Sequence, residues 1–364
     1  MYSLKKYVVA LFAAFAVSGG VAAAHLDVLN WSDYIAQNTL SNFEKRSGID
    51  VVYDVFDSNE VLEAKLLSGH SGYDLVAPTS EFLARQIKAH AFLEIDKSRL
   101  HNWKNLDTGL LQKLQAHDPG NHYAIPYMWG TTGIGYNREK IAEILGEEAP
   151  VDSWELVFNP KYLKQLQSHG VAFLDAPTEM FSAALNYLGL DPNSENPEDY
   201  ARAEKLLKEV SGYVRYFDNA RYISDLANGS IVLAVGWSGD IMMAADRSEE
   251  AHKPFHIAYT IPKEGAGVWF DMLAIPADAD DIDQAYQFID YLLEPKVIAE
   301  ISNVTSYANP NREAFRYVDK SIRDNPSIYP TGEASERLYS FHVINRKINR
   351  VITSSWNRVK AAHA

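Results

Sequence analysis

The sequence predicts an α/β protein built as two α/β lobes with a ligand cleft between them. Through the first hundred residues, short apolar runs alternate with amphipathic helical patterns, which is typical of βαβ units on a largely parallel sheet. The same alternation resumes at about residue 132, without a low-complexity linker before it. A chain of 364 residues also favours two domains over one.

In the first block, we expect strands at residues 26–30, 49–56 and 73–77. A helix between the first two strands is indicated by the spacing of Leu40 and Phe43, and we expect Gly48 to end it. Apolar residues at positions 61, 62 and 66 indicate a second helix, with Ser58 as its N-cap.

In the second block, we expect strands at 170–174 and 231–235 and helices at 180–188 and 200–210. Strand-like runs follow at 255–261 and 268–275, and helices from residue 282 onward. Since the chain crosses between the blocks more than once, we expect lobe 1 to comprise residues 25–130 and about 253–305, and lobe 2 about 131–252 and about 306–364. Gly130, Gly133 and Gly135 are expected to form a tight crossing between them.

Residues 1–24 are expected to form a secretory signal peptide. Lys5 and Lys6 give a basic start, an apolar run follows at 7–17, and small residues at 22–24 offer a cleavage site before His25. No later segment reaches the roughly 20 uninterrupted apolar residues that a membrane-spanning helix requires. The sequence has no cysteine, which excludes a lipid-modified N-terminal cysteine, and we expect a periplasmic protein held together by its core.

The chain is acidic. Its formal net charge is −14, and loss of Lys5 and Lys6 with the signal peptide takes the mature protein to −16. Such a field repels nucleic acid and phosphate ligands and raises the local concentration of cations. We therefore expect no nucleic-acid partner, and we expect a monomer. Charge alone does not identify a cation-binding protein, because many exported proteins are acidic.

Polar and aromatic residues gather where the expected strands end. Asn30-Trp31-Ser32-Asp33-Tyr34 follows the first strand directly. The same residue types recur at three further strand ends, namely Thr79-Ser80-Glu81, residues 175–179, and Gly236-Trp237-Ser238-Gly239-Asp240. Because ligands of open α/β sheets bind outside the carboxyl ends of the strands, we expect these residues to share one pocket in the cleft.

Carboxylates beside tryptophans suit an organic cation with a hydrocarbon body. Ammonium groups form charge-assisted hydrogen bonds with carboxylates, and an indole face attracts them further. The expected carboxylates are Asp33, Glu179, Asp240 and Asp271, and the expected walls are Trp31, Tyr34, Trp237, Trp269 and Tyr307. Asp271 lies inside an apolar run, where a buried carboxylate is costly unless a cation meets it. We assign Trp103, Trp154 and Trp356 to packing.

Other kinds of site are disfavoured. The histidines show no HExxH spacing and the chain has no cysteine, so we expect no metal and no other cofactor. A G-x-S-x-G elbow is absent from the sequence, which argues against an α/β-hydrolase. A glycoside-acting enzyme is the alternative that uses carboxylates beside tryptophans. The expected pocket holds more acids than that chemistry requires, so we expect a binding protein and not an enzyme.

Six motifs, spread in one order over the mature chain, carry a resemblance to a known family. They are residues 30–34, Val52-Tyr53-Asp54-Val55-Phe56-Asp57-Ser58-Asn59-Glu60, Pro126-Tyr127-Met128-Trp129, Phe173-Leu174-Asp175-Ala176-Pro177, residues 236–240, and Ile261-Pro262-Lys263-Glu264-Gly265. On these motifs the chain resembles the periplasmic polyamine-binding proteins of bacterial ABC importers, the putrescine- and spermidine-binding group. The resemblance implies a type II periplasmic-binding-protein fold whose lobes close over the ligand.

The resemblance also implies which residues contact the ligand. Carried over position by position, they are Trp31, Ser32, Asp33, Tyr34, Thr79, Glu179, Trp237, Asp240, Trp269, Asp271 and Tyr307. Two departures bear on ligand length: Trp269 stands where putrescine-preferring members tend to have phenylalanine, and Glu81 adds an acid near the mouth. A larger wall and a further acid favour a third charge, so we include Glu81 in the site and expect spermidine to be preferred over putrescine.

The implied role is that of an extracytoplasmic solute-binding protein. It would capture a polyamine between its open lobes and deliver it to an inner-membrane ABC permease, which would read the closure of the lobes. The ligand would select the closed state through the contacts that closure adds. A receptor that reports polyamines to a signalling partner is an alternative that the sequence does not separate from transport.

Overall fold

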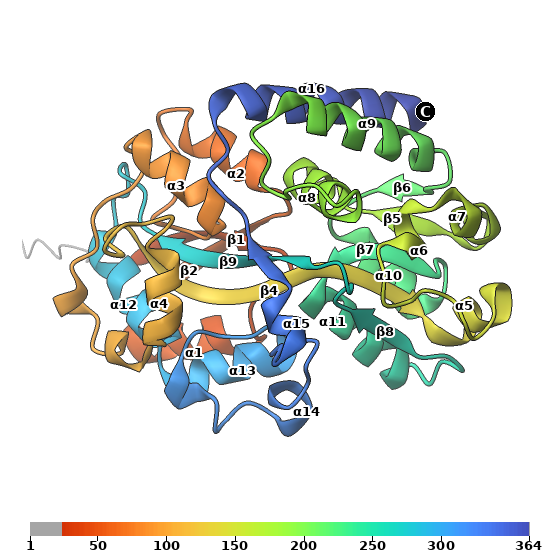
Figure 1. Cartoon of the computed structure of the whole chain (residues 1–364). Coiled ribbons are helices and arrows are strands. Elements are labelled where there is room, and N and C mark those ends of the chain that lie inside the picture. Colours follow the sequence, from red (N-terminus) through yellow and green to blue (C-terminus); the bar gives the residue numbers. More distant parts are fainter. Residues whose placement is uncertain (1–23, 364) are drawn as a thin grey trace, which may run out of the picture.

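The structure, a computed structural model, describes residues 24–363. The expected signal peptide therefore lies outside the described residues, apart from its last position. The chain folds into two α/β halves that lie side by side, and β4 and β9 run horizontally through both of them (Figure 1). The expected two-lobed α/β architecture is confirmed.

Within residues 24–363, ten strands form one connected sheet. They are β1 (His25–Trp31), β2 (Asp50–Phe56), β3 (Leu75–Val76), β4 (Ala124–Asn137), β5 (Val171–Phe173), β6 (Tyr216–Phe217), β7 (Leu233–Trp237), β8 (Ile257–Thr260), β9 (Ala266–Ala274) and β10 (Leu338–Ser340). Their order is β2-β1-β3-β9-β4-β7-β5-β6, with β8 beside β4 and β10 beside β9. The pairs β1–β2, β1–β3, β5–β6 and β5–β7 are parallel, as expected for βαβ units.

Helices cover the sheet in both halves. Those before β7 are α1 (Thr39–Ser47), α2 (Asn59–Leu66), α3 (Ser80–Lys88), α4 (Thr108–Leu114), α5 (Arg138–Leu145), α6 (Glu155–Phe158), α7 (Pro160–Leu166), α8 (Pro177–Tyr187), α9 (Pro197–Ser211) and α10 (Arg221–Asn228). The later ones are α11 (Ser238–Glu250), α12 (Ile282–Leu292), α13 (Pro295–Thr305), α14 (Lys320–Arg323), α15 (Glu333–Glu336) and α16 (Arg346–His363). No helix within residues 24–363 is long and apolar enough to cross a membrane.

Local signals in the sequence account for the first two helices. Gly48 follows α1 in the left-handed conformation, with φ of 73°, and its N–H donates to the Glu44 carbonyl. The Ser58 hydroxyl accepts a hydrogen bond from the Val61 N–H at 3.2 Å at the start of α2. The expected end of α1 at Gly48 and the expected N-cap of α2 at Ser58 are therefore confirmed.

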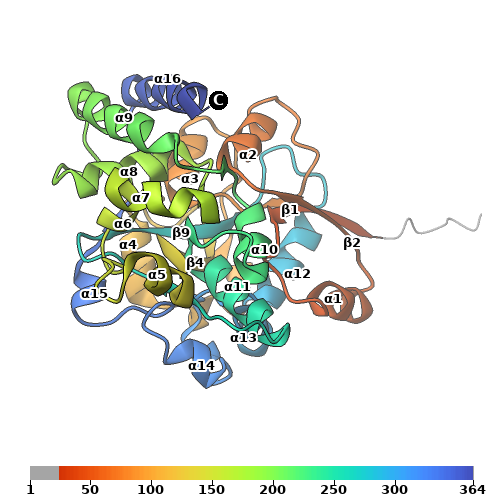
Figure 2. The ribbon, with the colours of Figure 1, turned by 90° about the vertical axis from the view of Figure 1, so that its right-hand side faces the viewer.

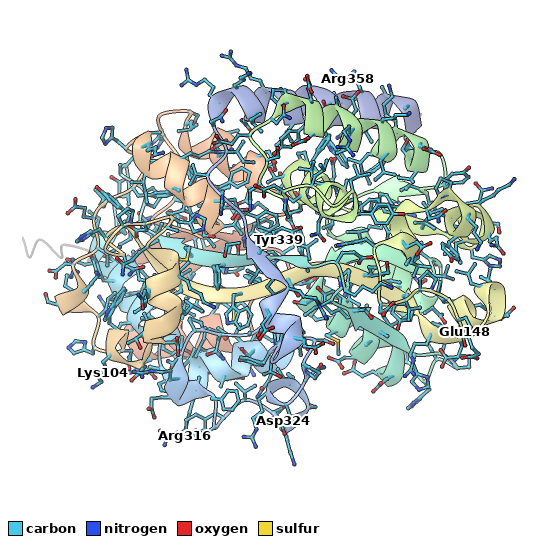
Figure 3. All side chains as sticks on the ribbon, in the orientation of Figure 1. Lys104, Glu148, Arg316, Asp324, Tyr339 and Arg358 are labelled. Atoms are coloured by element: carbon cyan, nitrogen blue, oxygen red, sulfur yellow. The ribbon has the colours of Figure 1, made fainter. Side chains whose placement is uncertain are left out.

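Three strands join the halves. The first part of β4 pairs with β9, and its second part pairs with β7 and β8, all antiparallel. Strand β10 pairs with β9 in parallel, and Figure 3 labels Tyr339 on β10 near the middle of the molecule. Gly130, Gly133 and Gly135 lie within the extended strand β4 and not in a turn. The expected crossing exists, as a continuous strand.

Each half has its own hydrophobic core. The first core contains side chains from Leu26 to Met128 and again from Trp269 to Phe341, and the second contains side chains from Ile134 to Ala266 and from Ile348 to Val359. Residues 257–261 thus pack with the second core and 307–341 with the first, which differs from the lobe limits expected from the sequence. We propose that the lobes follow these cores.

The C-terminal helix belongs to the second half. Figures 1 and 2 both show α16 lying along α9 at the top of the molecule. Trp356 lies on the buried face of α16, and its indole N–H donates to Asp175 at 2.6 Å. Arg358 forms a two-pronged ion pair with Glu204, on the stretch of α16 labelled in Figure 3. Trp154 is also fully buried, so both tryptophans serve packing as expected.

Candidate ligand-binding cleft

A cavity lies between the two lobes, at the strand ends where the sequence placed a pocket. Its empty volume is about 530 Å³ with its open mouth included. Every predicted site residue except Glu81 lines this cavity. The structure therefore brings together side chains that stand up to 276 positions apart, from Trp31 to Tyr307. Which of them contact a ligand stays a prediction.

Trp31, at the end of β1, forms part of the first-lobe wall. Its indole N–H donates to the Ala77 carbonyl at 2.9 Å, and its ring centroid lies 4.4 Å from that of Phe56. These contacts fix the indole plane against the core. The chain then turns at Asp33, whose φ of 53° is left-handed, and this turn separates the exposed Asp33 from the buried Tyr34.

Asp271 is the most deeply buried acid of the cavity. It lies on β9 and is 3 % exposed, and the hydroxyl of Tyr34 donates to its Oδ2 at 2.7 Å. Its Oδ1 is buried and receives no hydrogen bond from the described residues. Burial raises the pKa of Asp271 well above its usual value, and the hydrogen bond from Tyr34 opposes the rise. Tyr127 in turn holds Tyr34, by donating to its carbonyl at 2.7 Å.

Glu179 faces the cavity from the second lobe, at the start of α8. The Thr132 hydroxyl and the Trp237 indole N–H both donate to its Oε2, the indole at 2.9 Å. No hydrogen bond from the described residues reaches its Oε1. Burial raises the pKa of Glu179 to about 8, while the hydrogen bonds from Thr132 and Trp237 lower it and the nearby Glu81 raises it. One oxygen of this acid is thus free for a ligand.

Asp240 lies in the first turn of α11, where the helix dipole favours an acid. Unlike Asp271 and Glu179, it has both oxygens occupied. The Tyr222 hydroxyl donates to Oδ2 at 2.7 Å and the Tyr307 hydroxyl donates to Oδ1 at 2.6 Å. Burial raises the pKa of Asp240 to about 6, and these two hydrogen bonds oppose the rise. Asp240 can therefore attract a cationic ligand by its charge, but neither of its oxygens is left without a hydrogen bond.

Aromatic rings form a continuous wall across the cleft. The ring centroids of Trp31 and Trp237 lie 5.7 Å apart, those of Trp237 and Trp269 6.5 Å, and those of Trp269 and Tyr307 5.4 Å, each pair edge to face. Gly130 makes room for this wall, because a Cβ there would lie 2.7 Å from Cζ2 of Trp269. The missing side chain lets the indole pack directly on β4.

Contacts between the lobes cover the cavity. The Asn219 side-chain amide donates to the Asp57 carbonyl at 2.9 Å, and Arg247 on α11 lies 3.5 Å from the Asp33 carboxylate. Both charged side chains are about half exposed, so their ion pair is a weak contact. Together with the Trp31–Trp237 contact, these contacts between the lobes indicate that the cleft is closed. Acids buried in a closed cleft are electrostatically costly unless a cation meets them.

A chain with this pocket and fold has identifiable relatives. A model of the bacterial extracellular solute-binding proteins matches residues 38–330. The chain belongs to this family. It is 51 % identical, over 98 % of its length and 98 % of the relative, to the putrescine-binding periplasmic protein SpuD of Pseudomonas aeruginosa. It is 52 % identical, over 96 % of its length and 95 % of the relative, to the putrescine-binding periplasmic protein PotF of Escherichia coli.

The fold of this solute-binding protein is the type II periplasmic-binding-protein fold. It is similar to that of the spermidine/putrescine ABC transporter substrate-binding protein PotD of Streptococcus pneumoniae, with a TM-score of 0.75, 25 % identity, and 94 % of this chain and 100 % of PotD covered. These relatives are named as putrescine-binding proteins and as the substrate-binding protein of an ABC transporter. The protein is accordingly not an enzyme, and the glycoside-acting alternative is set aside.

Glu81 lies outside the main cavity. It lines a smaller adjoining chamber of about 300 Å³, which shares Trp31, Glu179 and Trp237 with the main cavity. Glu81 is 7 % exposed, so it is not a solvated acid at the start of α3. Burial raises its pKa to about 7. The structure thus places Glu81 in a chamber next to the cavity that the other predicted site residues line.

Sequence reasoning missed several residues that line the cavity of this solute-binding protein. They are Phe56, Asp57, Asn59, Asn219, Ala220 and Ile223. The first three directly follow or end β2, so the rule applied to the other strand ends could have found them. The others follow β6, which is only two residues long and gives no strand signal in the sequence. Within residues 24–363, no group of three or more acids and histidines is placed to hold a metal ion.

Proposed function

We propose that this protein captures a polyamine in the periplasm and delivers it to an inner-membrane ABC permease. The observation that carries the proposal is a pair of carboxylate oxygens that receive no hydrogen bond from the described residues, Oε1 of Glu179 and Oδ1 of Asp271. Both lie in the wall of an aromatic cavity, and burial raises both pKa values. A ligand with two ammonium groups supplies a donor and a positive charge to each.

Putrescine is the polyamine that we favour, in place of the spermidine expected from the sequence. Its two ammonium groups match the two free oxygens, and its four methylenes suit the aromatic wall between them. Relatives named for putrescine are 51 % and 52 % identical to this chain, whereas one named for spermidine and putrescine is 33 % identical. The argument for spermidine required Glu81 in the same cavity, and Glu81 lines the adjoining chamber.

Capture would be coupled to lobe closure. Tyr34 and Asp271 pack with the first core, whereas Glu179 and Asp240 are carried by helices of the second half. A diamine that contacts both sets gains its full interaction only when the lobes are closed, so it shifts the population towards the closed state. The permease would then recognise the closed, loaded form.

A thermal-shift screen of the mature protein, residues 25–364, tests capture. The ligands are putrescine, cadaverine, spermidine, spermine, basic amino acids and oligosaccharides. A ligand at about 100 times its Kd adds about 2.7 kcal/mol of stability, and we expect the largest shift with putrescine. A shift with an oligosaccharide and none with any polyamine would overturn the proposal. A larger shift with spermidine would restore the preference expected from the sequence.

Uptake of labelled putrescine tests delivery. Cells that lack the gene should accumulate the label more slowly than cells that carry it, and Asp271→Asn should fail to restore uptake. Normal uptake in cells without the gene, combined with tight binding by the purified protein, would favour the polyamine-sensing receptor over the transport role.

A further inference from the structure

Two polar groups in the cavity wall have no partner among the described residues. They are the indole Nε1 of Trp269 and the hydroxyl Oγ1 of Thr79. Both residues are 5 % exposed, so bulk water does not reach these atoms. An indole N–H is a donor only, and a buried donor without an acceptor is unfavourable. Both residues line the ligand cavity, so a bound ligand is the natural partner for them.

These two groups lie at the same end of the cavity as Asp271. Thr79 is the bridge partner of Asp271 in the sheet. Trp269 and Asp271 alternate with Phe270 along β9, so their side chains project from the same face of the strand. Oδ1 of Asp271 also receives no hydrogen bond from the described residues. One end of the cavity therefore presents three groups together: the Trp269 N–H as a donor, the Thr79 hydroxyl, and Oδ1 of Asp271 as an acceptor.

A protonated amine satisfies this end only in part. An ammonium group has three donors and no acceptor, so it serves Asp271 and the hydroxyl but leaves the Trp269 N–H unpaired. A group that donates and accepts at once fits all three positions. An amide or a urea is such a group, because it carries both an N–H donor and a C=O acceptor and has no charge.

We propose that the Asp271 end of the cavity takes an amide or urea group, so that the protein binds monoacylated and monocarbamoylated diamines as well as free diamines. The amide N–H donates to Oδ1 of Asp271, and the carbonyl oxygen accepts from the Trp269 N–H and the Thr79 hydroxyl. The free ammonium end meets Oε1 of Glu179, so this assignment rests on the proposed polyamine function.

Calorimetric titration with three ligands tests the proposal. N-acetylputrescine carries the amide, and hexylamine carries an ammonium group and a hydrocarbon chain without the amide. Binding of putrescine tests the proposed polyamine function itself. We expect N-acetylputrescine to bind at least about tenfold more tightly than hexylamine, since two to three hydrogen bonds distinguish them. Equal affinity for the two, with putrescine bound, would overturn the proposal and leave the polyamine function standing. No binding of putrescine would instead overturn the proposed function.

Two variants examine the partner groups separately. Trp269→Phe removes the indole N–H and keeps an aromatic wall, and Thr79→Val removes the hydroxyl at nearly constant volume. Trp269→Phe should raise the ratio of the N-acetylputrescine Kd to the putrescine Kd by about fivefold to tenfold, whereas Thr79→Val, whose hydroxyl meets either ligand, should weaken both. Trp103→Phe, outside the cavity, should leave both affinities unchanged. If Trp269→Phe folds and leaves the ratio unchanged, an ordered water and not the ligand pairs with the indole N–H, and the proposal is wrong.

Discussion

Tyr307 and Asp240 form a double contact that joins the two halves of the molecule. The Tyr307 hydroxyl donates to Oδ1 of Asp240 at 2.6 Å and accepts from the Asp240 N–H at 3.2 Å. Tyr307 packs in the first core, whereas Asp240 opens helix α11 of the second half. Because Tyr222 occupies the other oxygen, this acid is held in place before any ligand arrives. Asp271, by contrast, keeps one free oxygen.

Asp271→Asn should weaken putrescine binding more than any other single carboxylate substitution in the cavity. It removes the charge that meets a ligand ammonium at the most buried position, which is worth about 1.5 to 3 kcal/mol for a hydrogen bond to a charged group. Calorimetry measures the loss. Asp283→Asn, at an 81 % exposed side chain outside the cavity, is the matched control. Unchanged affinity in Asp271→Asn would place the ligand elsewhere.

The empty protein should lose stability as the pH rises from about 4 to about 8. Burial raises the pKa of Asp240 to about 6 and that of Glu179 to about 8, so the folded state binds more protons than the unfolded state over this range. A carboxyl with a raised pKa destabilises the fold once it ionises. For the buried Asp240 alone, the shift corresponds to about 3 kcal/mol.

Putrescine should oppose this loss, because a bound dication stabilises the ionised carboxyls. The ligand-induced rise in Tm should therefore be larger at pH 8 than at pH 5, and binding at pH 7 should release protons. Thermal unfolding over this pH range, with and without putrescine, measures the first effect. Titration in buffers of different ionisation enthalpy measures the second. A shift in Tm that is larger at pH 5 has the wrong sign for this account.

Gly130→Ala should disturb the aromatic wall. The new Cβ would lie 2.7 Å from Cζ2 of Trp269, too close for two carbon atoms, so the indole must move. We expect a loss of about 1 to 3 kcal/mol in stability, together with weaker binding. Gly212→Ala is the matched control, since nothing lies within 4 Å of its Cβ and its φ of −65° suits alanine. Equal effects of the two substitutions would show that Trp269 does not depend on Gly130.

Arg247→Ala should have a small effect on affinity. Arg247 and Asp33 are 41 % and 53 % exposed, and exposed ion pairs are worth about 0 to 1 kcal/mol. We expect the affinity for putrescine to fall by less than about fivefold, and the difference from the unmodified protein to shrink in 0.5 M salt. A loss of more than about thirtyfold would mean that this ion pair controls closure.

Much of the site was predictable because it is local to strand ends. Trp31 ends β1, and Glu179 and Asp240 lie in the first turns of the helices that follow β5 and β7, so a rule about strand ends locates them without knowledge of the topology. Asp271 was recognisable for a different reason, as an acid within an apolar strand. The separation of Glu81 from these residues was not predictable, because it depends on how the Glu179 and Trp237 side chains divide the cleft.

The residues at which the two cores begin and end could not be predicted from the sequence either. Residues 307–341 follow α13 of the first half and pack with it, although the helical pattern of the C-terminal part gives no sign of the crossing at β10. Strand β10 is only three residues long, and it pairs with β9 through a parallel register set by tertiary contacts. Short strands of this kind carry too few residues to show a period.

Calorimetric titration of the mature protein with putrescine is the most direct test of the central claim. The account predicts one ligand per protein, bound with measurable heat between Glu179 and Asp271, and binding severely weakened in the double variant Glu179→Gln, Asp271→Asn. No heat with putrescine or any other polyamine, in a protein that unfolds cooperatively on heating, would contradict the claim that this cleft holds an organic dication.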